Sequence, residues 1–225
     1  MKLSYFENRK MKIIISSELS LIGKGANGQV FKYNKPITQN KLTAVVKVSG
    51  RLNLKKAIEN YDLINQTGVM SLAFYEECHV DGQPAILMED LFTDEMVYVS
   101  PNSVRNGYLN NVPEAYLLQN KLTDIANMGC LLEQMRNLVI CTDGKGIGLD
   151  MDMISFGVKK GEKVPEVSYK LVDIDGMLHD DSMRYKLYEE NVLSAQEALE
   201  RFVEYFVETR VVQDKLIQQI KNFLW

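Results

Sequence analysis

Short apolar runs separated by polar residues and glycines fill the first part of the chain, a pattern that is typical of β-strands. The dipeptide Asp81-Gly82 separates the last two runs and predicts a tight hairpin. Residues 53–66 differ, because their apolar side chains recur at helical spacing and predict one helix. The predicted strands are Ile13–Ile15, Leu19–Ile22, Val30–Tyr33, Leu42–Val48, Ser71–Val80 and Pro84–Met88.

The second part of the chain is mostly helical in pattern. Residues 94–112 are polar and irregular and are expected to form a loop, after which Pro113 is well placed to open a helix that runs to about Asn137. Residues 139–176 return to strand-like runs, and residues 183–224 again have helical spacing. The sequence therefore predicts an α+β chain in two parts, 1–91 and 92–225.

The composition is that of an ordinary globular protein, with 225 residues of which 46% are hydrophobic and 25% charged. The net charge of −4 argues against a nucleic-acid partner. No apolar run approaches the ~18 residues that a membrane span needs, and the N-terminal sequence lacks the apolar core of a Sec signal. We expect a cytoplasmic protein, or one exported by a route without a Sec signal. Three widely spaced cysteines, Cys78, Cys130 and Cys141, match neither a zinc site nor a disulfide framework.

A glycine pattern, G-x-G-x-x-G, occurs at Gly23, Gly25 and Gly28. A dinucleotide-binding fold needs a helix directly after such glycines, to hold the pyrophosphate at its N-terminus. The residues that follow Gly28 instead alternate in a way that favours a strand, so the glycines are predicted to lie in a hairpin. Phosphates bound by such a hairpin require a nearby cation, and Lys47 stands on the next predicted strand.

The glycine hairpin, Val30 and the run Ala44-Val45-Val46-Lys47 follow one another in an order that resembles the protein-kinase-like superfamily. The resemblance covers residues 19 to about 176. It implies a two-lobed fold, with an antiparallel β N-lobe that carries one helix and a reduced, mostly helical C-lobe without a full activation segment.

The resemblance also implies roles for residues of the first lobe. The glycines would cover the phosphates of ATP, Lys47 would hold the α- and β-phosphates, and Glu59 would orient Lys47. The alternative for Glu59 is a solvated charge on a helix. The remaining implied nucleotide-binding residues are Val30 and Met88, which face the base, and Glu89 and Leu91, whose backbone groups bind adenine.

A metal-binding aspartate is implied in the second lobe. The run Tyr169-Lys-Leu-Val-Asp173-Ile174-Asp175-Gly176 is similar to the D-F-G segment, with Ile and Asp in place of Phe and Gly. On this alignment Asp173 binds Mg²⁺, and Asp175 assists.

The catalytic loop has two candidate alignments, because the chain contains no H-R-D sequence. In the preferred one, Asp150 orients the acceptor hydroxyl, Ser155 stands at the position of the second metal ligand, and an apolar strand follows. In the other, Asp143 takes that role, with Lys145 two residues later. A third interpretation makes these acids ordinary turn residues.

The resemblance implies an ATP- and Mg²⁺-dependent kinase that transfers the γ-phosphate to serine or threonine of a protein substrate. Only 49 residues follow Gly176, and there is no A-P-E sequence, as in the minimal kinases among bacterial effectors. Such an enzyme is competent by itself or depends on an activating partner. The alternatives are a pseudokinase that binds nucleotide without transfer, a small-molecule phosphotransferase, and an AMP transferase.

Overall fold

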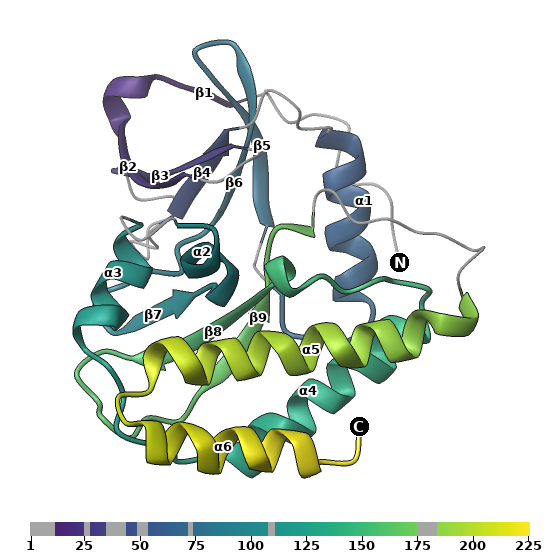
Figure 1. Ribbon diagram of the computed structural model, residues 1–225. Helices are drawn as coiled ribbons and strands as arrows, with labels where there is room; N and C mark the ends of the chain where they lie inside the picture. Colours follow the sequence, from purple (N-terminus) through teal and green to yellow (C-terminus); the bar gives the residue numbers. More distant parts are fainter. Residues whose placement is uncertain are drawn as a thin grey trace. The chain divides into compact units, whose positions relative to one another are not determined.

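The computed structural model describes residues 12–24, 28–34, 44–48, 54–71, 74–107, 111–174 and 184–225. These residues form an α+β fold (Figure 1). The chain divides into two compact units: unit 1 is Met1–Leu54 with Ala73–Asp90, and unit 2 is Lys55–Leu72 with Leu91–Trp225. The boundary expected after residue 91 lies beside the change of unit at Asp90. The helix predicted over 53–66 belongs to unit 2. Each unit is described by itself.

Unit 1 is built on a six-stranded sheet in the order β1-β5-β6-β4-β3-β2. All six strands that the apolar runs predict are confirmed, with ends shifted by a few residues. Their bounds are β1 (Lys12–Ile14), β2 (Leu19–Lys24), β3 (Gln29–Tyr33), β4 (Ala44–Val48), β5 (Phe74–Val80) and β6 (Gln83–Glu89).

The sheet is mixed, so the expectation of an antiparallel sheet is wrong at one pairing. β1 runs parallel to β5, with Ile14 opposite Val80, while the other neighbours are antiparallel. β1 and β2 occupy the two edges of the sheet but are joined only by Ile15 and the short 3₁₀ helix η1 (Ser16–Glu18). Because so short a link spans little distance, the sheet has to curl until its edges approach each other.

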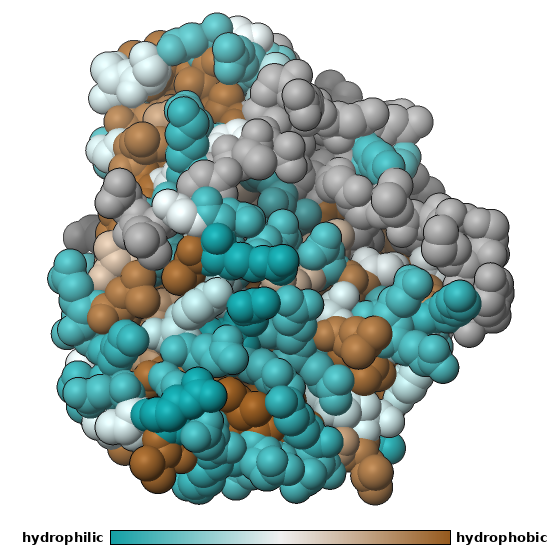
Figure 2. All heavy atoms as spheres, in the orientation of Figure 1, coloured by the Kyte–Doolittle hydropathy of each residue, from teal (hydrophilic) through white to brown (hydrophobic). Residues whose placement is uncertain are grey.

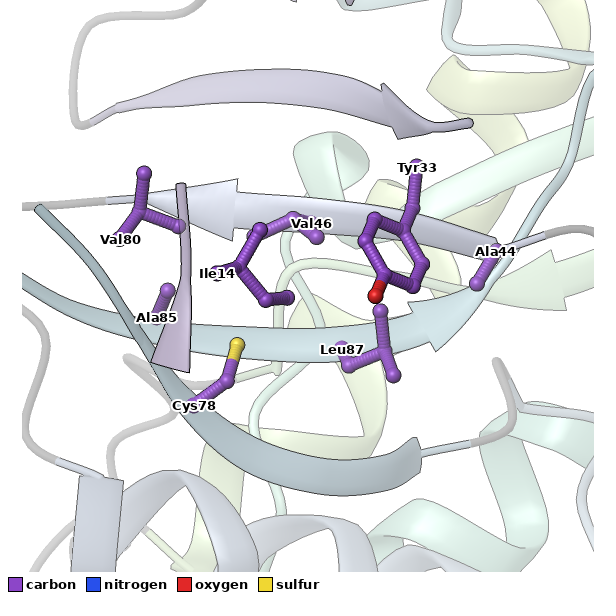
Figure 3. Close-up of a cluster of buried hydrophobic side chains, with 8 residues drawn as sticks. All are labelled: Ile14, Tyr33, Ala44, Val46, Cys78, Val80, Ala85 and Leu87. Atoms are coloured by element: carbon purple, nitrogen blue, oxygen red, sulfur yellow. The ribbon is translucent and has the colours of Figure 1, made fainter. Parts of the chain in front are cut away.

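Curling the sheet creates an apolar interior. Figure 3 shows side chains from five strands converging there. Alternate residues of each strand point to the same side, so the interior takes every second residue. The hairpin between β5 and β6 turns at Asp81 and Gly82, which both have positive φ (47° and 84°), as predicted for this dipeptide. The interior residues are Ile14, Tyr33, Ala44, Val46, Cys78, Val80, Ala85 and Leu87.

Unit 2 contains the described helices and a second, three-stranded sheet in the order β7-β8-β9. The strands are β7 (Met96–Val99), β8 (Ile154–Lys159) and β9 (Ser168–Leu171). The helices are α1 (Leu54–Asn65), α2 (Pro101–Arg105), α3 (Val112–Gln119), α4 (Met128–Asp143), α5 (Arg184–Phe206) and α6 (Arg210–Asn222), with the 3₁₀ turn η2 (Met151–Met153).

Two local predictions for unit 2 are wrong. Residues 94–112 are not only loop, since β7, α2 and the start of α3 lie there. β7 pairs with β8, which is distant in sequence, so the local pattern of the four residues of β7 could not reveal this strand. In addition, α4 continues to Asp143 through residues expected to begin a strand.

Each of the two long predicted helices is interrupted by a non-helical segment, and these two segments are hydrogen-bonded to each other. Leu122, between α3 and α4, donates its N–H to the carbonyl of Phe206 at 2.8 Å. Glu208, between α5 and α6, donates its N–H to the carbonyl of Leu122, also at 2.8 Å. The backbone leaves the helical path at both places because each segment supplies the hydrogen-bond partners that the other needs.

The core of unit 2 lies between α5 and the small sheet. The ring centroids of Phe156 and Phe202 are 4.8 Å apart, and those of Phe202 and Phe206 are 5.5 Å apart. The outer face of α5 and α6 is mostly hydrophilic (Figure 2). No helix in the described ranges is both long and apolar enough to cross a membrane.

Candidate functional site

The glycine hairpin joins β2 to β3, as the sequence predicts. Gly23 lies opposite Val30 in the register, next to an irregularity between Leu21 and Gly23 that increases local twist. Gly28 directly precedes β3 and is half-buried. Gly25 falls outside the described residues. The two described glycines therefore lie on the two sides of the same turn.

Lys47 lies in the middle of the sheet, on β4. It is directly opposite Val30 of β3 on one side and Ile86 of β6 on the other. Directly opposed residues share a face of the sheet, so Val30, Lys47 and Ile86 form one row across three strands. The next row on the same face contains Val45 opposite Met88.

This row lies on the face turned away from the curled interior. The neighbours Val46 and Leu87 belong to the interior, whereas Lys47 and Ile86 alternate with them and point to the other side. Lys47 is nevertheless only 8% exposed. It shares this face with the side chains of Val30, Val45, Ile86 and Met88.

The end of β6 carries the residues predicted to contact adenine. Met88 is buried and Glu89, opposite Ala44, is half-buried. The carbonyl of Leu91 accepts a hydrogen bond from the N–H of Tyr98 at 2.9 Å, so this carbonyl already takes part in the backbone hydrogen bonding of unit 2.

One charged residue in this segment was not predicted as a site residue. Asp90 is 3% exposed and pairs with Lys32 of β3 at 3.5 Å. The alternation of Val30 and Lys32 places Lys32 on the Lys47 face of the sheet. The sequence contained a signal for this pair. It was an acid directly after an apolar strand, together with a lysine two residues after Val30.

Glu59 lies on α1 in unit 2, and its side chain is exposed. The adjacent Asn60 was not predicted as a site residue, but it is 2% exposed and donates a hydrogen bond from Nδ2 to the carbonyl of Ile174 at 2.7 Å. α1 thereby holds the residue that follows Asp173.

Asp173 follows β9 and has a positive φ of 55°, which is unusual for a residue with a side chain. Its neighbours fix this conformation. The N–H of Val172 donates to the carbonyl of Met153 at 2.7 Å, and Asn60 holds Ile174 from the other side. Backbone conformations of this kind cost about 1–3 kcal/mol and persist where the surroundings impose them, often at functional sites.

Three aspartates of unit 2 interact electrostatically. Partial desolvation, followed by the charges of Asp150 and Asp173, raises the pKa of Asp152. Arg105 of α2 opposes this rise. The carboxylate of Asp150 also accepts a hydrogen bond from the N–H of Asp152. Asp150 and Asp173, which the sequence nominated separately, therefore both act on the pKa of Asp152.

The remaining predicted residues of unit 2 lie elsewhere. Asp143 is the last residue of α4, and its carbonyl accepts a hydrogen bond from the N–H of Gly146 at 2.9 Å. Ser155 is buried on β8 opposite Lys170, on the face of the small sheet that also carries Gly157. Asp175 falls outside the described residues.

Carboxylate oxygens are the donors that Mg²⁺ prefers, and Mg²⁺ commonly takes one or two of them together with substrate phosphates and water. The carboxylate of Asp173 offers one such donor. Among the residues that the structure describes, no group of three or more acidic, histidine or cysteine side chains is arranged to hold a metal ion. A metal at Asp173 would therefore complete its coordination with phosphate oxygens and water.

No protein-family model matches the chain, and no curated protein matches its sequence.

Proposed function

We propose that the protein is a minimal protein-kinase-like enzyme that transfers the γ-phosphate of ATP to a serine or threonine hydroxyl of a protein. The observation that carries this proposal is the row Val30–Lys47–Ile86, in which a buried lysine lies among apolar side chains directly behind a glycine hairpin. An apolar surface suits the base of a nucleotide, and the ammonium suits its phosphates. Unit 1 would then hold ATP, with Gly23 and Gly28 of the hairpin allowing the backbone to approach the phosphates.

Unit 2 would supply the acidic groups. Asp173 would hold Mg²⁺, which neutralises phosphate charge when it is bound. Asp150 would orient the acceptor hydroxyl and accept its proton. The oxygen of that hydroxyl bonds to the γ-phosphorus, the bond from the γ-phosphorus to the bridging oxygen breaks, and ADP leaves with the electron pair. Asp150 is preferred to Asp143 because Asp150 shares electrostatic contact with Asp152, as Asp173 does.

The experiment is phosphate transfer from γ-labelled ATP with Mg²⁺, to a cell lysate and to the protein itself, measured together with ATP binding. Lys47→Met and Asp173→Asn are expected to lower transfer by about 100-fold or more, because the first removes a positive charge from the phosphates and the second removes the carboxylate that would hold Mg²⁺. Lys159→Met is the matched control: this lysine also lies on a strand, but its side chain is 61% exposed and pairs only locally with Glu162 at 3.3 Å.

The proposal fails if the wild-type protein neither binds ATP nor transfers phosphate to any acceptor. ATP binding that Lys47→Met abolishes, without transfer by the wild type, would identify a nucleotide-binding module instead. Transfer of AMP rather than phosphate would appear as a different mass added to the acceptor.

A further inference from the structure

Asn191 of α5 is completely buried, and its side chain binds the last turn of α4 and the loop that follows it. Its Oδ1 accepts a hydrogen bond from the N–H of Leu149 at 2.7 Å. Its Nδ2 donates to the carbonyl of Ile147 at 2.9 Å and to the hydroxyl of Thr142 at 3.2 Å. The loop between α4 and η2 is therefore held by a buried amide side chain, which contacts it immediately before Asp150.

Ser194, one helical turn after Asn191, holds the same segment. Its hydroxyl donates to the carbonyl of Leu149 at 2.9 Å. Both backbone polar groups of Leu149 are thus bound to α5 side chains, one to Asn191 and one to Ser194. Residues i and i+3 lie on the same face of a helix, so these two side chains act together.

The position of Asn191 calls for a polar residue only because of this loop. The residues around it on the same helix face, such as Leu187, Ala195 and Ala198, are buried and apolar. An amide placed among them costs free energy unless each of its groups is bonded. The carbonyl of Ile147 and the N–H of Leu149 belong to a segment outside any helix or strand, so they need partners from elsewhere. The amide of Asn191 supplies these partners and has its own groups bonded in return, so the backbone at Leu149 is fixed.

We propose that Asn191 is a positioning residue that fixes the backbone leading into Asp150 and thereby holds the Asp150 carboxylate against the backbone N–H of Asp152. The expected effect of Asn191 on the rate of phosphate transfer rests on the proposed function, whereas its effect on the loop backbone does not. Ser194 supports the same geometry.

The test compares two buried amides of unit 2. Asn191→Leu removes the loop contacts and keeps the approximate volume. Gln213→Met is the matched control, because Gln213 is also buried and donates from Nε2 to the carbonyls of Val207 at 2.8 Å and Glu204 at 3.1 Å, at the junction of α5 and α6. Asn191→Asp keeps an acceptor for the N–H of Leu149 and loses both donated hydrogen bonds. Its kcat and its rate of Leu149 exchange should therefore fall between those of the wild type and Asn191→Leu.

Four quantities are measured for each variant: unfolding in urea, hydrogen exchange of the Leu149 amide, the kcat of phosphate transfer, and the affinity for ATP. Misplacing a reacting group by about 1 Å can cost ~100-fold in rate. We expect Asn191→Leu to lower kcat by about 10- to 100-fold, to leave ATP affinity unchanged within about twofold, and to speed the exchange of Leu149. Gln213→Met should lose comparable stability and keep its kcat.

Equal kcat values for Asn191→Leu and Gln213→Met at matched stability would overturn the inference. If the wild type transfers no phosphate, the proposed function fails, and the exchange of Leu149 still decides the structural claim. Unchanged exchange in Asn191→Leu would refute it, and faster exchange confined to the loop would support it.

Discussion

The carboxylate of Asp150 accepts a hydrogen bond from the backbone N–H of Asp152 at 3.2 Å. This bond caps the 3₁₀ turn η2 and fixes the aspartate relative to the acid two residues later. An asparagine in the same place would still offer a side-chain oxygen to the N–H of Asp152. The charge of Asp150 can therefore be removed with little disturbance of the turn, which makes a clean test of its role.

Asp150→Asn is expected to lower phosphate transfer by about 100-fold, since a positioned base typically contributes 10²–10⁴-fold. Thermal stability should change little. Asp143→Asn should keep transfer and slightly stabilise α4, because a negative charge at a helix C-terminus is unfavourable. Both variants are assayed with γ-labelled ATP. The opposite ranking, with Asp143→Asn inactive and Asp150→Asn active, would move the catalytic role to Asp143.

Much of unit 1 was predictable from the sequence because its strands are short, regular and bounded by turn residues. Asp81-Gly82 has the backbone conformation that its residue types favour. The parallel pairing of β1 with β5 was not predictable, since it depends on a sheet that curls back on itself. In unit 2, the break at Leu122 and the one after Phe206 satisfy each other, and no local pattern contains that information.

The candidate site also contains some residues that the sequence could nominate and others that it could not. Lys47 and Val30 were nominated from spacing, and their register on β3 and β4 places them directly opposite each other. Asn60 and Asn191 were not nominated, because a single buried amide in a helix has no pattern of its own. Their importance appears only when the backbone groups that they bind are known, Ile174 for Asn60 and Leu149 for Asn191.

Closure of the unit 1 sheet by β1 can be tested with two neighbouring isoleucines. Ile14 is fully buried in the interior, and Ile13 is 72% exposed on the other side of the same strand. Ile14→Ala is expected to lower the free energy of unfolding by about 2–5 kcal/mol, as buried isoleucine truncations do. Ile13→Ala should change it by less than about 0.5 kcal/mol. Urea unfolding measures both, and equal effects would show that β1 does not cover the core.

Gly157 in the small sheet leaves room for the ring of Tyr98. A Cβ atom at position 157 would lie 2.3 Å from a ring carbon of Tyr98, whose hydroxyl is held at 3.2 Å from that of Ser168. Gly157→Ala is therefore expected to destabilise the protein by about 1–3 kcal/mol through overpacking. Gly129→Ala is the matched control in α4, where nothing lies within 4 Å of the added carbon. It should stabilise by about 0.4–1 kcal/mol. A stable Gly157→Ala variant would contradict the packing of Tyr98 on β8.

A buried carboxyl group in unit 2 should make stability depend on pH. Glu114, in the first turn of α3, is 4% exposed, and its Oε1 accepts a hydrogen bond from the N–H of Ser100 at 3.1 Å. Burial raises the pKa of Glu114 to about 7, and the hydrogen bonds from Ser100 and Ser103 oppose this rise only in part. The folded protein thus keeps a proton that the unfolded chain releases at its ordinary pKa of 4.5.

This difference fixes the sign of the pH dependence. Between pH 4.5 and about 7 the unfolded state binds fewer protons than the folded state, so the contribution of Glu114 to stability falls as the pH rises and levels off above pH 7. Glu114→Gln retains an oxygen for the N–H of Ser100 and carries no charge. The variant should match the wild type near pH 4 and exceed it by up to about 3 kcal/mol at pH 8. Urea unfolding of both proteins at the two pH values measures the difference, in which the other titrating groups cancel. A stability difference that stays constant with pH would show that the pKa of Glu114 is not raised in the folded protein.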